Sequence, residues 1–171
     1  MNITFHVMTG VATAVVLAPI GNSPKWKAAK LLAGFSVGIF LHGVFDYLPH
    51  WYPFASGVDL MLAAAMVLAA FGFTDRSEWM LVATCLFGSI LPDLIDFGPM
   101  MADLLLGLPV PSLPFKVFPW HWEKYSGAIY DGSNATASAV LHISILAVTG
   151  LILFLWPALF KKNEDGHKNR K

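Results

Sequence analysis

The stretch Ala28–Leu48 reads AAKLLAGFSVGIFLHGVFDYL, with one lysine near its start and a single acid near its end. A helix of about 20 apolar residues spans the hydrocarbon layer of a bilayer, so this stretch predicts a transmembrane helix. His42 and Asp46 are four residues apart and therefore share one face of that helix. Ionisable side chains inside a span are costly, so this pair indicates a functional site near one end of the helix.

Four further apolar segments extend this interpretation to the whole chain. The protein has 171 residues, of which 56% are hydrophobic and 13% charged. Soluble domains carry about 25% charged residues, so the composition is typical of a membrane protein. We predict an all-α, polytopic membrane helical bundle of about five transmembrane helices, with one integral membrane domain over residues 1–160 and a polar tail over 161–171. The other segments are Phe5–Ile20, which is the shortest, Gly57–Phe73, Glu78–Phe97 and Thr136–Phe160.

The distribution of charge predicts an orientation. Nine of the eleven Lys and Arg residues follow the first, third and fifth segments, and only Lys116 and Lys124 lie on the opposite side. Basic residues favour the cytoplasmic side, so we expect the N-terminus outside and the C-terminus in the cytoplasm of a plasma or inner membrane. The formal net charge is zero, which gives no attraction to nucleic acid. The lipid bilayer is the partner that the sequence predicts, and the oligomeric state stays open.

Residues 98–133 differ from the rest of the chain. They hold five of the eleven prolines, together with several aromatic residues. A connection of this length in a compact domain is usually functional or disordered, and the aromatic content argues against disorder. We therefore predict an outer lid loop on the membrane surface, with a short helix over Met101–Leu108.

Histidines and carboxylates gather on the outer side of this predicted topology. Histidine nitrogens and carboxylate oxygens, without thiolates, suit Zn²⁺, with Mn²⁺ or Fe²⁺ as alternatives. We expect one or two such ions. Asp96 or Glu123 is the expected general base. The candidate metal ligands are His6, His42, Asp46, His50, Asp93, His121 and His142.

Structural roles are the alternative for each of these residues. His42 and Asp46 could satisfy one another, and two carboxylates as close as Asp93 and Asp96 repel each other unless a cation lies between them. His121 and Glu123 could be a solvated pair in the lid. Asp59, near the start of the third segment, is more typical of an acid at a helix N-terminus than of a ligand.

Three short motifs carry a family resemblance. Leu41–His50 reads LHGVFDYLPH, Gly88–Asp93 reads GSILPD, and a His-Trp segment follows at His121. With an N-terminal histidine, this pattern resembles small uncharacterised prokaryotic membrane proteins that share HxxxDxxPH and LPD blocks. These are distantly similar to predicted inner-membrane metal-dependent hydrolases of the YdjM-like type. That type carries an HRGxTH block, and the nearest stretch here is His121-Trp-Glu.

The resemblance and the one-sided polar layer together predict a membrane-bound metal-dependent hydrolase. Its expected substrate is a lipid-linked or membrane-embedded ester or phosphoester. A metal or proton transporter and an accessory structural membrane protein are the alternatives. A conduction path needs polar residues through the whole bilayer, and the inner halves of the segments are largely apolar, which favours a surface site.

Overall fold

The computed structural model describes residues 1–21, 23–131 and 133–160, and only the backbone of 156–160. The polar tail predicted over 161–171 lies outside the described residues. Within the described ranges the chain is helical and contains no strand, which confirms the all-α prediction. Two short 3₁₀ turns, at Arg76–Glu78 and Pro119–His121, accompany the helices. The helices are α1 (Ile3–Leu17), α2 (Pro24–Tyr47), α3 (Ser56–Phe73), α4 (Trp79–Asp96), α5 (Gly98–Leu106) and α6 (Ala135–Phe160).

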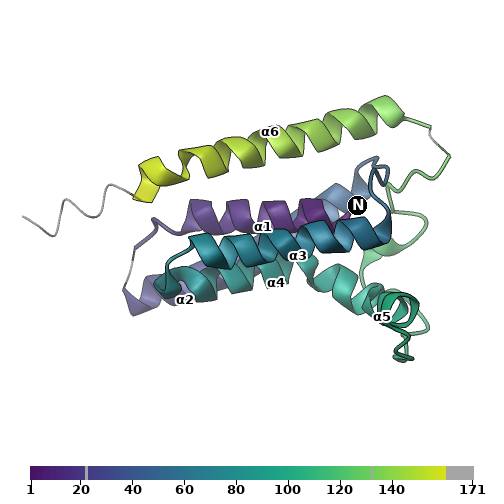
Figure 1. Ribbon diagram of the computed structural model, residues 1–171, viewed down its shortest axis with the longest axis horizontal. Coiled ribbons are helices and arrows are strands. Elements are labelled where there is room, and N and C mark those ends of the chain that lie inside the picture. Colours follow the sequence, from purple (N-terminus) through teal and green to yellow (C-terminus); the bar gives the residue numbers. More distant parts are fainter. Residues whose placement is uncertain (22, 132, 161–171) are drawn as a thin grey trace, which may run out of the picture.

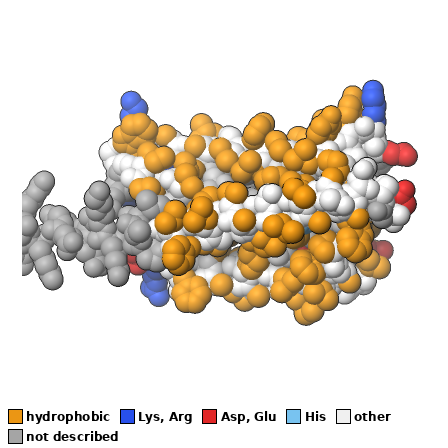
Figure 2. Space-filling view, turned by 90° about the horizontal axis from the view of Figure 1, so that it is seen from above, with side chains coloured by type: hydrophobic (Ala, Val, Ile, Leu, Met, Phe, Trp, Pro, Cys, Tyr) orange, Lys and Arg blue, Asp and Glu red, His pale blue; other side chains and the backbone are white. Residues whose placement is uncertain are grey.

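Four of these helices, α2, α3, α4 with its preceding turn, and α6, are long and apolar enough to cross a membrane. They lie alongside one another (Figure 1). Hydrophobic side chains cover the visible face along the bundle, and charged side chains gather toward its two ends (Figure 2). The segment Phe5–Ile20, expected to be a further span, forms the shorter helix α1. Its 15 residues extend only about 22 Å.

Helix α1 is the central helix of the bundle. It contacts α2, α3, α4 and α6, and most of its side chains are buried. A helix that is apolar on all sides is stable only when neighbours surround it, which explains this position. His6, on the first turns of α1, is therefore placed inside the bundle and is fully buried.

Asp59 of α3 fixes the N-terminus of α1. Its carboxylate accepts hydrogen bonds from the backbone N–H groups of Ile3, at 2.8 Å, and Thr4, at 3.0 Å. The Thr4 hydroxyl adds a third bond at 2.7 Å. The first N–H groups of a helix have no partner within the helix, and a carboxylate there also complements the helix dipole. Asp59 therefore acts at a helix N-terminus, as expected, but the helix is α1 and not its own.

Small residues bring α2 and α4 unusually close. A Cβ atom added to Gly38 would lie 2.7 Å from the backbone nitrogen of Ser89, and one added to Gly88 would lie 2.3 Å from the carbonyl oxygen of Phe35. Small residues allow helix backbones to approach in this way. The close contact at Gly38 brings His42 next to the backbone of α4.

The lid, residues 98–133, begins with α5, which overlaps the short helix expected over Met101–Leu108, and then covers the ends of α2 and α4 (Figure 1). Two sets of hydrogen bonds hold it in place. Asp96 accepts bonds from the backbone of Val117 and Phe118 at 2.7 and 3.0 Å. His50 pairs with Ala128 through a short parallel bridge. The end of the bundle covered by the lid is called the lid end below.

Candidate metal centre

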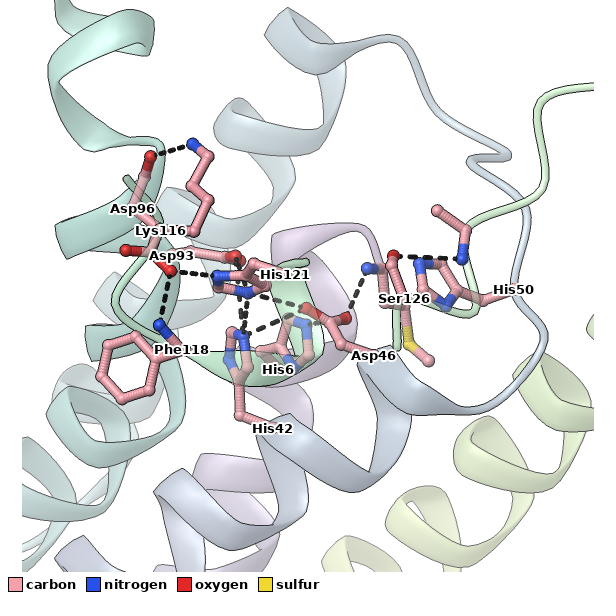
Figure 3. Close-up of polar contacts among 12 residues, drawn as sticks. His6, His42, Asp46, His50, Asp93, Asp96, Lys116, Phe118, His121 and Ser126 are labelled. Atoms are coloured by element: carbon pink, nitrogen blue, oxygen red, sulfur yellow. Dashed lines mark hydrogen bonds and ion pairs between the residues drawn. The ribbon is translucent and has the colours of Figure 1, made fainter. Parts of the chain in front are cut away.

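Four side chains from three parts of the chain meet at the lid end. His42 and Asp46 come from α2, Asp93 from α4 and His121 from the lid. One donor atom from each lies within 4.8 Å of all the others. Figure 3 shows their polar ends directed toward one another. We call these four residues the four-donor cluster.

The distances within the cluster match those around a small four-coordinate ion. His42 Nε2 lies 3.2 Å from Asp46 Oδ2 and 3.5 Å from Asp93 Oδ1. His121 Nε2 lies 3.1 and 3.4 Å from the same two oxygens, and 3.3 Å from His42 Nε2. A tetrahedron of ligands about 2.0–2.1 Å from a zinc ion has edges of about 3.3 Å. The donor set therefore fits a divalent ion of this size, and its two carboxylates would balance the ion's charge.

Both imidazole rings are oriented so that Nε2 faces the cluster. His42 donates its Nδ1–H to the backbone carbonyl of Ser89 at 2.7 Å, and His121 donates its Nδ1–H to Asp96 Oδ2 at 2.7 Å. A carbonyl and an ionised carboxylate can only accept, so the proton of each neutral ring resides on Nδ1. Partners of this kind fix the tautomer of metal-binding histidines.

Asp96 lies behind His121 and does not face the centre of the cluster. Besides His121, its carboxylate accepts the two backbone bonds that hold Val117 and Phe118. The Lys116 ammonium group donates a hydrogen bond to the backbone carbonyl of Asp96. A carboxylate with three donors and a fully buried side chain is suited to orienting His121. The sequence had suggested Asp96 as a general base, and this geometry instead favours a positioning role.

His6 supports the cluster from the α1 side. Its Nε2 lies 3.2 Å from Asp46 Oδ1, the oxygen that does not face His121. The Met1 amino group contacts the same oxygen. The ring of His6 also stacks on that of His42, with 3.8 Å between centroids and 14° between planes. His6 thus orients both donors that α2 supplies, His42 and Asp46. It is not itself one of the four donors that could hold one ion.

The surrounding carboxylates change the acidity of His121, which lies in the lid. Burial alone would lower its pKa, but hydrogen bonds to Asp46, Asp93 and Asp96 outweigh burial and raise the pKa of His121 to about 9. Without an ion, the Nε2 atom of His121 therefore carries a proton near neutral pH. A divalent cation would satisfy the same nitrogens and carboxylates in place of that proton.

The cluster is nearly closed, and its accessible member is Asp93. The side chains of His42, Asp46 and His121 are at most 5% exposed, whereas that of Asp93 is 18% exposed. Asp93 Oδ1 faces the two imidazoles. Solvent therefore reaches the cluster at Asp93 before the other three donors.

Three other predicted site residues lie outside the cluster. His50 is set apart from it (Figure 3) and donates its Nδ1–H to the Leu48 carbonyl at 2.8 Å. Burial lowers the pKa of His50 to about 4. His142, on α6, donates to the Ser138 carbonyl at 2.8 Å and packs against Phe5. Glu123 is exposed on the lid. The structure thus brings together His42, Asp46, Asp93 and His121, with His6 and Asp96 as neighbours.

The backbone carbonyl of Ser89 is a functional group that the sequence does not reveal. It orients His42, yet an acceptor on the main chain has no signature in residue type. Pro92 lacks the N–H that would bond to the carbonyl of Gly88, one position earlier, so it gives no direct signal for Ser89. The contact of Asp59 with the N-terminus of α1 was also not predicted, because the two partners are far apart in the sequence.

Comparison with known proteins adds no family to this description. No family model matches the chain, and neither a curated protein nor a solved structure matches it. The functional argument therefore depends on the geometry of the lid end.

Proposed function

We propose that this protein is a membrane-bound, metal-dependent hydrolase that acts on a phosphoester of a lipid-like substrate. The observation that carries the proposal is the four-donor cluster, in which two imidazole nitrogens and two carboxylate oxygens all lie within 4.8 Å of one another. Zn²⁺ is the ion that best fits the donors, with Mn²⁺ and Fe²⁺ as alternatives.

A bound divalent ion would supply acidified water and polarise a phosphoryl oxygen. The chain would contribute position and charge. His42 and His121 hold their nitrogens in place through Ser89 and Asp96, and Asp46 is held by His6. Such preorganisation places the reacting groups without further rearrangement. The lid, which supplies His121, would exclude bulk water from the reacting centre.

Asp93 is the candidate proton acceptor. It is the most accessible of the four donors, and Oδ1 alone faces the imidazoles. Its second oxygen has no hydrogen bond in the described part of the chain, so it is free to accept a proton from an attacking water. Asp96 is engaged by three donors, and Glu123 is exposed and outside the cluster, so both are less suited than Asp93.

A transporter is less consistent with the packing beneath the cluster. The core between α1 and α4 continues from Ser89 toward the other end of the bundle through apolar residues that include Leu81, Val82, Cys85 and Leu86. A conduction path requires polar groups or water along this route. The site therefore resembles a pocket that opens at the lid end more than a point along a channel.

Metal content and hydrolysis, measured on the same preparations, test the proposal. The wild-type protein, purified with added metal, should bind about one Zn²⁺ per chain and hydrolyse a lipid phosphoester. His42→Ala and Asp93→Ala should lose both properties, whereas Asp103→Asn, on the exposed face of α5, should keep them. Hydrolysis retained by the His42→Ala/Asp93→Ala double variant would refute the proposal.

A further inference from the structure

A large apolar groove lies between α2 and the lid. Its volume is about 620 Å³, and its walls are α2 residues between Phe40 and Tyr47, the C-cap residue Leu48, and lid residues between Pro119 and Tyr125. The lining side chains are aliphatic or aromatic. Small-molecule sites typically have volumes of about 300–1,000 Å³ and mostly apolar walls, so this groove has the size and lining of a ligand site.

The groove and the four-donor cluster lie at the same depth of the bundle. Phe40 and Leu48, which line the groove, bracket His42 and Asp46 on the same helix. The two features also share a wall. The Trp120 ring packs directly on Gly43, where an added Cβ would lie 2.7 Å from the ring, and its centroid is 6.2 Å from that of His42.

The groove opens on the exposed face of α2, a helix that is long enough to cross a membrane. Phe40 and Tyr47 are 67% and 62% exposed, and both lie on α2. In a bilayer such side chains would face lipid, because aromatic rings favour the zone where chains meet headgroups. A hydrocarbon chain could therefore enter the groove from the membrane without crossing water.

Polar groups at the rim fit the charged end of a lipid. The Lys124 ammonium group lies 5.2 Å from the ring centroid of Tyr125, which lines the groove. This positive charge complements a phosphate. The Trp120 indole nitrogen is buried without a hydrogen-bond partner in the described residues. An ester oxygen that reached it would give this buried donor the hydrogen-bond partner that it lacks.

We propose that this groove holds a hydrocarbon chain of a membrane lipid, with the phosphoester end of the same lipid directed to the four-donor cluster. The identity of the reacting end rests on the proposed function, whereas the occupancy of the groove does not. A smaller apolar crevice of about 350 Å³ lies elsewhere, among α1, α2 and α6. It contains no lid residue, so it serves as the competing location.

Photocrosslinking locates the chain directly. A phosphatidylglycerol with a diazirine on its acyl chain is incorporated into nanodiscs with the full-length protein, and labelled residues are mapped by mass spectrometry. We expect labels concentrated at Phe40–Leu48 and Pro119–Tyr125. Val44→Trp, which fills the groove, should reduce this labelling at least fivefold. The matched variant Leu68→Trp, at a residue of α3 that is 73% exposed, should not.

The outcomes separate the groove from the catalytic proposal. Labels spread evenly over the exposed helices, or concentrated on α6 at the competing crevice, would overturn the groove, as would undiminished labelling of a Val44→Trp protein that elutes from size-exclusion chromatography like the wild type. If Val44→Trp fails to fold, Tyr47→Ala removes a wall of the groove and should shift the labels. Should hydrolysis be absent while the labels map as expected, the proposed function fails and the lipid site stands.

Discussion

His42 and His121 point their Nε2 atoms at each other across 3.3 Å, while each ring donates its Nδ1–H in another direction. Two nitrogens that both present lone pairs repel each other at this distance, so either a proton, as on His121 in the metal-free protein, or a metal ion must lie between them. Residues 79 positions apart in the chain are held in this arrangement by Ser89 and Asp96. A divalent ion can replace that proton, which is the physical reason to expect metal binding there.

Asp96→Asn should weaken metal binding without abolishing it. The amide can still accept a bond from His121, but it removes the negative charge that increases the basicity of the ring. Changes of this kind typically lower metal affinity about 10–100-fold. Competition with a chromophoric chelator measures the effect, with Glu123→Gln as the control that should bind like the wild type. An affinity unchanged in Asp96→Asn would show that Asp96 does not act through His121.

Metal binding should also order the lid. His121 is the one member of the four-donor cluster that the lid supplies, so an ion would link the lid to α2 and α4. An ion that binds only when the lid holds His121 against α2 and α4 stabilises that position of the lid. Amide hydrogen exchange over residues 116–130 should slow at least tenfold with Zn²⁺ in the wild type and remain fast in Asp93→Asn. Equal exchange with and without Zn²⁺ in the wild type would contradict this link.

The affinity for metal should increase with pH up to about 9. The pKa of His121 is raised to about 9 in the metal-free protein, so below that value a proton must leave before Nε2 can bind an ion. One displaced proton gives about a tenfold gain in apparent affinity per pH unit, and the gain should level off above pH 9. Chelator competition between pH 6 and 9.5, corrected for protonation of the chelator, measures the slope. A flat profile from pH 6 to 8 would contradict a protonated His121.

His50 should make the protein less stable in mild acid. Its pKa is lowered to about 4 in the folded state by burial and is about 6.5 in an unfolded chain. The unfolded state therefore binds more protons between these values. The stability that His50 contributes is complete above pH 6.5 and is lost as the pH falls toward 4, by up to about 3 kcal/mol. Unfolding in mixed detergent micelles should show a smaller pH dependence for His50→Asn, and parallel curves for the two proteins would count against this origin.

The sequence predicted how far along each helix the site residues lie. It did not predict which of them point toward the centre of the bundle. Counting residues along apolar segments places His42, Asp46 and Asp93 at one level. Whether a residue at that level faces the centre depends on the rotation of each helix. His142 lies at a similar level on α6 but faces Phe5, and nothing local in its sequence distinguishes the two cases.

The lid shows the same limit. An extended strand would have pointed His121 and Glu123 to the same side. The structure has a 3₁₀ turn over Pro119–His121, which turns His121 inward while Glu123 is exposed. The hydrogen bonds of Asp96 to the lid backbone determine this conformation, and such a long-range contact has no periodic signal in the sequence.

The approach of α2 to α4 should determine whether the site forms. Gly38→Ala or Gly88→Ala would place a methyl group within 2.7 or 2.3 Å of backbone atoms on the facing helix, so the helices must separate. Overpacking of this kind costs about 1–3 kcal/mol of stability. Because His42 reaches the Ser89 carbonyl across the same contact, metal affinity should fall together with stability.

Gly72→Ala is the matched control for these variants. It also introduces Ala in a span, on α3, but nothing lies within 4 Å of its new methyl group, so stability and metal binding should be unchanged or slightly improved. Unfolding in mixed micelles and Zn²⁺ titration of the same samples provide both readouts. If Gly38→Ala lost stability but bound Zn²⁺ with wild-type affinity, the close contact of α2 and α4 would be architecture alone, and the orientation of His42 would not depend on it.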